Sequence, residues 1–214
     1  MAAKLKICGL MRPEEAESAV RAGAAYLGVV FAEGPRTVTP DVACEIVDRA
    51  GDATVMGVFT GHSATQILQI CGRTGLRGAQ LHGTYSPASA ARLRDAGLLV
   101  WRVVRIAAPE DLDLLAEAVH QSDAVLVEPR VPHVQGGAGL PLDLAVAREA
   151  RSRLSGHPMV LAGGLNADTV GEAIVLVRPE IVDVSSGVES LPGIKDLDKI
   201  ARFAEAVFAH SSYT

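Results

Sequence analysis

Residues 159–187 read MVLAGGLNADTVGEAIVLVRPEIVDVSSG. Two short apolar runs, Met159–Ala162 and Ile181–Val184, enclose a longer segment, Asp168–Val177, that has the length and pattern of a helix. Short runs rich in Val, Ile and Leu are typical of parallel strands that are buried on both faces. The stretch therefore predicts a strand–helix–strand unit, with glycine or serine directly after each strand.

The same alternation continues outward from this unit to both ends of the chain. Eight apolar runs are predicted to be strands, at Leu5–Cys8, Tyr26–Phe31, Thr54–Phe59, Arg77–Leu81, Leu98–Val104, Ala124–Val127, Met159–Ala162 and Ile181–Val184. Helical patterns are found at Pro13–Ala22, Pro40–Ala50, Ser63–Arg73, Pro87–Ala96, Pro109–His120, Leu142–Leu154, Asp168–Val177 and Leu197–Ala209. Eight repeats with short connections predict a single closed (β/α)8 TIM barrel over residues 1–210, followed by a polar tail at 211–214.

An open doubly wound α/β sheet is the alternative fold for such an alternating pattern. That fold usually begins with a glycine-rich nucleotide turn, G-x-G-x-x-G, after its first strand. Here the first predicted strand ends in Cys8-Gly9-Leu10 instead. The number of repeats and the missing turn both favour the closed barrel.

The composition of the 214 residues excludes several classes of function. The net charge of −5 and the scattered arginines give no basic patch for nucleic acid. No apolar run reaches the length of a membrane span. The three cysteines have no C-x-x-C spacing, and no His, Cys, Asp or Glu cluster has the spacing of a metal site. We expect a cytoplasmic protein without a metal site, monomeric or a small homo-oligomer.

The loops after the last two strands are candidates for a phosphate site, because barrel enzymes often bind phosphate there. Gly163 and Gly164 follow the seventh predicted strand, and Ser185, Ser186 and Gly187 follow the eighth. Glycine lets backbone N–H groups approach an oxyanion closely, and a short helix after Gly187 would add its positive end. The glycines could instead only turn the chain, but their presence in both loops favours a phosphate site.

Two residues at strand ends are candidates for proton transfer. Cys8 ends the first predicted strand, and Glu128 follows the sixth. A buried free cysteine is usually an inert small residue, but positive neighbours can lower its pKa enough for the thiol to accept a proton. A carboxyl group after an apolar strand is expected to point into the barrel mouth. The two side chains make a candidate base and acid pair.

Other polar residues near strand ends have both a binding and a structural interpretation. Arg36 could clamp a substrate carboxylate or phosphate, or it could pair with Glu33 or Asp41 on the surface. Asp183 could hydrogen-bond a substrate amine or brace its own loop. A single histidine at the rim, such as His82, is more often structural than catalytic.

At these residues the sequence resembles the phosphoribosylanthranilate isomerase family. Lys6-Ile7-Cys8-Gly9-Leu10 resembles the family's K-I-C-G opening. The likeness covers essentially the whole chain, in order, at Gly28–Phe31, Pro35–Val38, Gly57–Phe59, Gln80–Gly83, Leu161–Asn166 and Val182–Glu189. The last two stretches are the most specific.

The resemblance implies an aldose–ketose isomerase of tryptophan biosynthesis. Such an enzyme converts an N-phosphoribosyl anthranilate into the corresponding aminoketose by an Amadori rearrangement, without a cofactor. By this resemblance Cys8 would be the general base at the second carbon of the sugar, and Glu128 would be the general acid at the ring oxygen. Arg36 and Asp183 would help to hold the anthranilate end, and the two glycine- and serine-containing loops would hold the phosphate.

The sequence departs from the family pattern around the predicted acid. Family members carry Asp where this chain has Glu128, which is one methylene longer. The loop Gly136-Gly137-Ala138-Gly139 stands for G-G-T-G, Asp143-Leu144 for a D-W or N-W pair, and Thr60-Gly61 for Val-Asn. The changes leave two alternatives open: a related barrel enzyme on another phosphorylated sugar amine, and a phosphosugar-binding protein without turnover.

Overall fold

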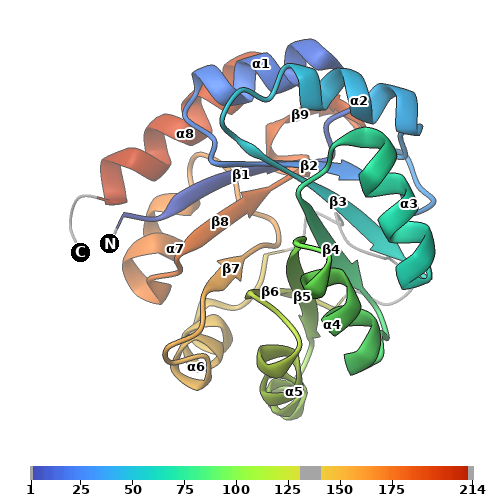
Figure 1. Cartoon of the computed structure of the whole chain (residues 1–214). Helices are drawn as coiled ribbons and strands as arrows, with labels where there is room; N and C mark the ends of the chain where they lie inside the picture. Colours follow the sequence, from blue (N-terminus) through green and yellow to red (C-terminus); the bar gives the residue numbers. More distant parts are fainter. Residues whose placement is uncertain (1, 131–140, 212–214) are drawn as a thin grey trace.

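The computed structural model describes residues 2–130 and 141–211 and contains the predicted TIM barrel. Eight parallel strands close into a ring in chain order, with the last paired to the first; they are β1 Lys4–Cys8, β2 Tyr26–Val30, β3 Thr54–Thr60, β4 Gly78–His82, β5 Leu99–Ile106, β6 Ala124–Pro129, β7 Met159–Leu161 and β8 Ile181–Val184. The helices that surround them in Figure 1 are α1 Pro13–Arg21, α2 Pro40–Asp48, α3 Ala64–Thr74, α4 Pro87–Asp95, α5 Leu114–His120, α6 Leu144–Arg153, α7 Val170–Val177 and α8 Leu197–Ser211.

Two layers of apolar side chains hold this architecture together. The larger layer lies between the strands and the helices and includes Leu5, Ile7, Ile46 and Phe203, none of which is exposed. The smaller layer fills the inside of the barrel, mostly at the amino ends and in the middle of the strands; its members are Met56, Trp101, Val103, Ala124, Leu126, Val160, Ala162 and Ile181. This inner layer closes one end of the barrel, so that a cavity can open only at the carboxyl ends of the strands.

The alternation of side chains along each strand decides which residues face the inside of the barrel. On β1 every second residue points inward, so that Lys6 and Cys8 share a face. Lys6 is fully buried, and its Nζ lies 5.7 Å from the centre of the Trp101 ring in the inner apolar layer. Cys8 stands one inward position further along, at the carboxyl end. The strand register therefore stacks a lysine beneath the cysteine.

Two predicted helices begin differently in the structure. The segment predicted as one helix at Pro109–His120 begins as a 3-10 helix, Pro109–Asp113, because the Asp111 carboxylate accepts the backbone N–H groups of Ala107 and Ala108 and tightens this first turn. Helix α7 begins two residues late, at Val170. The Asn166 side chain accepts the backbone N–H groups of the next turn, those of Asp168 and Thr169, and so delays the helix.

The chain after β8 forms a small antiparallel hairpin that the sequence pattern did not predict. A one-turn 3-10 helix, Ser186–Val188, takes the place of the expected short helix after Gly187. It leads into β9 Glu189–Leu191 and β10 Ile194–Lys195. Strands of three and two residues are too short to give a periodic signal. The hairpin carries two buried charged residues, Glu189 and Lys195, and Lys195 contacts Ser185 in the loop after β8.

Candidate functional site

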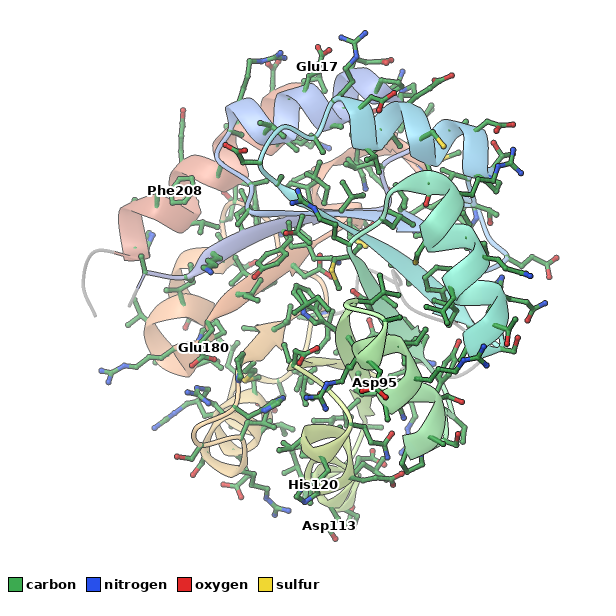
Figure 2. The ribbon with its side chains drawn as sticks, in the orientation of Figure 1. Glu17, Asp95, Asp113, His120, Glu180 and Phe208 are labelled. Carbon is green, nitrogen blue, oxygen red and sulfur yellow. The ribbon has the colours of Figure 1, made fainter. Side chains whose placement is uncertain are left out.

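A cavity opens at the carboxyl ends of the barrel strands. Its lining includes eight of the nine predicted site residues: Cys8, Arg36, Glu128, Gly163, Gly164, Asp183, Ser185 and Ser186. Four further polar side chains from strand ends also line it: Thr60, Gln80, His82 and Arg105. Figure 2 shows the space inside the ring of strands filled by side chains, whereas Glu17 and Phe208 lie on the outer helices. The structure thus brings residues from all parts of the chain to one cavity.

Cys8 owes its place in this cavity to a glycine on the neighbouring strand. The β1–β2 register pairs Cys8 with Gly28, and a Cβ atom at Gly28 would lie 2.6 Å from the Cys8 sulfur. Only glycine leaves room for the thiol at this position. The Cys8 side chain is buried but still contributes to the cavity lining.

A buried ion pair lies beside Cys8. The Nζ atom of Lys6 is 2.9 Å from Oδ1 of Asp183, and the two residues are register partners in the β1–β8 ladder. Burial raises the pKa of the Cys8 thiol, and the charge and hydrogen bond of Lys6 oppose this rise. Lys6 is therefore the positive neighbour that a cysteine needs if it is to accept a proton.

Glu128 stands three strands away from Cys8 around the ring, among other polar side chains. Its Oε1 lies 3.3 Å from Nε of Arg105 and 3.9 Å from Nδ1 of His82. Burial raises the pKa of Glu128 to about 7, against the opposing charge of Arg105. Burial also lowers the pKa of His82, to about 4, so that its imidazole is neutral at neutral pH. A carboxyl group that titrates near pH 7 is suited to donate a proton.

Arg36 has a partner that the sequence does not predict. Its Nε and Nη2 donate to the two carboxylate oxygens of Glu189, at 2.7 and 2.8 Å. The pairing with Glu33 or Asp41 that the sequence left open is not found, and Asp41 pairs with Arg73 instead. Arg36 still lines the cavity.

The loops after β7 and β8 have the backbone shapes that glycine permits. Gly163 and Gly164 have φ angles of +105° and +62°, in the region that other residues rarely adopt. Ser185 and Ser186, in the loop after the neighbouring strand β8, line the same cavity. Gly187, the ninth predicted site residue, is not part of the lining. Its lack of a side chain serves close packing, since a Cβ atom there would collide with the carbonyl oxygen of Leu165.

Several polar residues of the site were missed or undervalued at the sequence level. Lys6, Glu189 and Lys195 were assigned no role, and Gln80, which lies 3.2 Å from His82, was noted only as part of a motif. The period of two along β1 would have placed Lys6 on the same face as Cys8. No such signal exists for Glu189 and Lys195, because the hairpin brings them in. The loop Gly136–Gly139, which departs from the family's G-G-T-G motif, lies outside the described residues.

Residues 2–130 and 141–211 contain neither a group of side chains that could hold a metal ion nor a helix that could span a membrane. Within these ranges no three His, Cys, Asp or Glu side chains group closely enough to hold a metal ion. No helix in the same ranges combines the length and the apolar character that crossing a bilayer requires.

Comparison with known proteins gives one consistent family. Residues 5–206 match the family described as N-(5′-phosphoribosyl)anthranilate (PRA) isomerase. The N-(5′-phosphoribosyl)anthranilate isomerase of Zymomonas mobilis subsp. mobilis is 39% identical over 97% of this chain and 99% of its own.

Two solved structures of similar proteins agree with this match. The phosphoribosyl anthranilate isomerase of Thermotoga maritima is 31% identical, with a TM-score of 0.87 over 96% of this chain and 98% of its own. A phosphoribosyl anthranilate isomerase in complex with reduced 1-(o-carboxyphenylamino)-1-deoxyribulose 5-phosphate is 30% identical, with a TM-score of 0.84 and the same coverage.

Proposed function

Because this chain belongs to the N-(5′-phosphoribosyl)anthranilate isomerase family, we propose that it catalyses the Amadori rearrangement of N-(5′-phosphoribosyl)anthranilate to 1-(o-carboxyphenylamino)-1-deoxyribulose 5-phosphate. One observation carries the assignment of roles: Cys8 and Glu128 line the same cavity from strands three apart in the ring, next to the loops after β7 and β8.

Glu128 acts first, as the general acid. It donates its proton to the ring oxygen of the sugar while the bond from that oxygen to the first carbon breaks. The nitrogen lone pair of the substrate then forms a double bond to this carbon, which gives an open-chain iminium ion. The pKa of Glu128, about 7, keeps a large fraction of the carboxyl protonated at neutral pH. Arg105, 3.3 Å away, then stabilises the carboxylate that remains.

Cys8 acts second, as the general base. The iminium ion makes the adjacent second carbon acidic, so that the thiolate of Cys8 can take its proton. The electrons of the broken C–H bond form a double bond between the first two carbons, while those of the carbon–nitrogen double bond return to nitrogen, which gives an enolamine. Protonation of the first carbon and loss of the proton from the hydroxyl group on the second carbon then give the ketone. Each proton transfer is worth about a hundred- to ten-thousandfold in rate. The rearrangement is redox-neutral, because the first carbon is reduced as the second is oxidised.

The remaining site residues hold the substrate. Arg36 binds the anthranilate carboxylate, and Asp183, which Lys6 braces, accepts the hydrogen bond of the anthranilate nitrogen. Backbone N–H groups at Gly163, Gly164, Ser185 and Ser186 bind the phosphate, with Gly187 allowing their loop to approach. We propose a cytoplasmic enzyme that is monomeric or a small homo-oligomer.

Turnover of freshly made substrate, followed by the loss of anthranilate-type fluorescence, tests the proposal. Cys8→Ser and Glu128→Gln should each lower kcat at least about a hundredfold. Cys44→Ser on α2 and Glu180→Gln, which both lie outside the cavity lining, serve as matched controls.

Three outcomes would contradict the proposal in different ways. Wild-type rates in both cavity variants would rule out the two catalytic roles. Activity only on another aminoaldose phosphate would indicate a related barrel enzyme. Tight binding of the substrate in calorimetry without any turnover would indicate a phosphosugar-binding protein.

A further inference from the structure

A cluster of three charged side chains, Arg36, Glu189 and Lys195, connects the hairpin to the loop after β2 and to the loop after β8. Glu189 lies at its centre, with 8% of its surface exposed. It accepts two hydrogen bonds from Arg36 and one from Nζ of Lys195, at 2.8 Å. Burial alone would raise the pKa of Glu189, but the hydrogen bonds from Arg36 and Lys195 outweigh it and hold the pKa below its ordinary value. Glu189 is therefore ionised at neutral pH.

The geometry at Arg36 leaves one edge of its guanidinium group for a ligand. Nε and Nη2 both face Glu189, which fixes the plane of the group, since two parallel N–H···O bonds allow little rotation. Among the described residues no hydrogen bond joins Nη1 to a partner. The aliphatic part of Arg36 passes close to Gly9, which leaves room for it, since a Cβ atom at Gly9 would lie 2.6 Å from the Arg36 Cδ. Glu189 thus determines where the exposed edge of Arg36 points.

Lys195 extends the cluster to the loop after β8. Its Nζ donates to the carbonyl oxygen of Ser185 at 3.0 Å and to the Ser185 hydroxyl at 3.3 Å. The backbone of Lys195 is itself fixed, since its N–H donates to the fully buried Glu15. The two cations outnumber the single anion, so the cluster carries a net positive charge beneath the loop.

We propose that Glu189 is a positioning residue that aims Arg36 at the anthranilate carboxylate, while the loop that binds the phosphate keeps its own tether, the hydrogen bonds from Lys195 to Ser185. The inference rests on the proposed function, because it takes the two ends of that substrate as the groups that Arg36 and the Ser185 loop receive. A carboxylate clamp of this kind binds substrate and transition state alike, so that its loss raises KM and leaves kcat largely unchanged.

The test uses the full-length enzyme with Glu189→Gln, which keeps the shape of the side chain and removes its charge. KM for the substrate and the inhibition constant of anthranilate should rise about ten- to a hundredfold, as expected for the loss of a charged hydrogen-bonded pair. The inhibition constant of inorganic phosphate should change less than about threefold. If Glu189→Gln does not fold, Glu189→Asp, which draws the carboxylate back by one methylene, provides the same measurements.

A double-mutant cycle separates positioning from a merely structural role. In an Arg36→Ala background the Glu189→Gln substitution should no longer affect KM, because the residue acts through Arg36. Glu180→Gln removes a comparable carboxylate from Arg151, 2.7 Å away, and should leave both inhibition constants unchanged. Glu180 lies away from the cavity and is labelled in Figure 2.

Two results would overturn the inference. One is that Glu189→Gln raises KM equally in the wild-type and the Arg36→Ala background; the other is that Glu189→Gln weakens the binding of anthranilate and of inorganic phosphate equally. The failure of the proposed function is recognised separately, by the absence of turnover in the wild-type enzyme. In that case calorimetry with anthranilate and inorganic phosphate still decides whether Glu189 aims Arg36.

Discussion

Lys6 and Asp183 face each other across the β1–β8 ladder and form a 2.9 Å ion pair one inward position deeper in the barrel than Cys8. The ammonium group is fully buried and also faces the thiol. Burying a charge is unfavourable unless a partner compensates it, so the pair has to be explained by more than packing. Its position explains it under the proposed mechanism, because the positive charge favours the thiolate form of Cys8 that this mechanism needs.

The first prediction concerns Lys6→Met. The substitution removes the charge that opposes the rise of the Cys8 pKa, so the thiol should react more slowly with iodoacetamide at pH 8, measured in a Cys44→Ser background. Cys71, with a pKa raised to about 11, contributes little to this reaction. Unpaired Asp183 should lower the free energy of unfolding by about 3–5 kcal/mol. Lys4→Met, an exposed lysine on the same strand, is the control; an unchanged rate of alkylation in Lys6→Met would contradict the role of Lys6.

The second prediction concerns Gly28→Ala. A Cβ atom at this position lies 2.6 Å from the Cys8 sulfur and displaces it from the cavity. Because a misplacement of about 1 Å can lower a rate about a hundredfold, kcat should fall by that order. Gly72→Ala on α3 is the matched control, since a Cβ atom there meets nothing within 4 Å. Equal kcat values for the two alanine variants would show that Gly28 does not position the thiol.

The third prediction is the pH dependence of kcat/KM. In the proposed mechanism the active form has Glu128 protonated and Cys8 ionised. Below about pH 7 Glu128 stays protonated, so kcat/KM rises with pH as the fraction of Cys8 thiolate increases. Above about pH 7 the fraction of protonated Glu128 falls as fast as the fraction of thiolate rises, so the two effects cancel. The profile should therefore bend near pH 7, stay level, and fall above the raised pKa of Cys8.

Arg105→Gln tests the assignment of that bend. The groups around Glu128 are His82 on β4, Arg105 on β5, Asp183 on β8 and Lys6 on β1. Arg105 lowers the pKa of Glu128, so its removal should move the bend upward by about one pH unit. His82→Gln replaces a neutral side chain and should leave the bend in place. A bend that stays near pH 7 without Arg105 would mean that another group causes it.

The fourth prediction concerns stability. The pKa of Glu128 is raised in the folded protein, from 4.5 to about 7, so the folded state holds this proton more tightly than the unfolded state. Its contribution is fully present below about pH 4.5 and is lost as the pH rises to about 7. Glu128→Gln removes this loss and should be more stable than wild type at pH 8 by about 3 kcal/mol, and by much less at pH 5. Urea unfolding at both pH values measures the difference, and equal differences would contradict the raised pKa.

The sequence determined the barrel because its information is local. Each strand and helix shows its own periodicity, and eight repeats with short connections can close in few ways. The same locality predicted that Cys8, Glu128 and Asp183 meet at one end of the barrel, since residues that end parallel strands lie there, and in the structure all three line one cavity. Lys6 was within reach of the same argument through its spacing of two from Cys8.

Only the tertiary structure decided which charged groups pair. Arg36 and Glu189 are 153 residues apart, Lys6 and Asp183 are 177 apart, and no periodic pattern connects partners at such distances. The same holds for the pKa of Glu128, which depends on burial and on the neighbouring strands. Local sequence specifies strands, helices and turns, because the backbone angles of a residue depend mainly on that residue and its neighbours in the chain. Electrostatics at a site depends on three-dimensional distance and on exclusion of water, which exist only once the ring has closed.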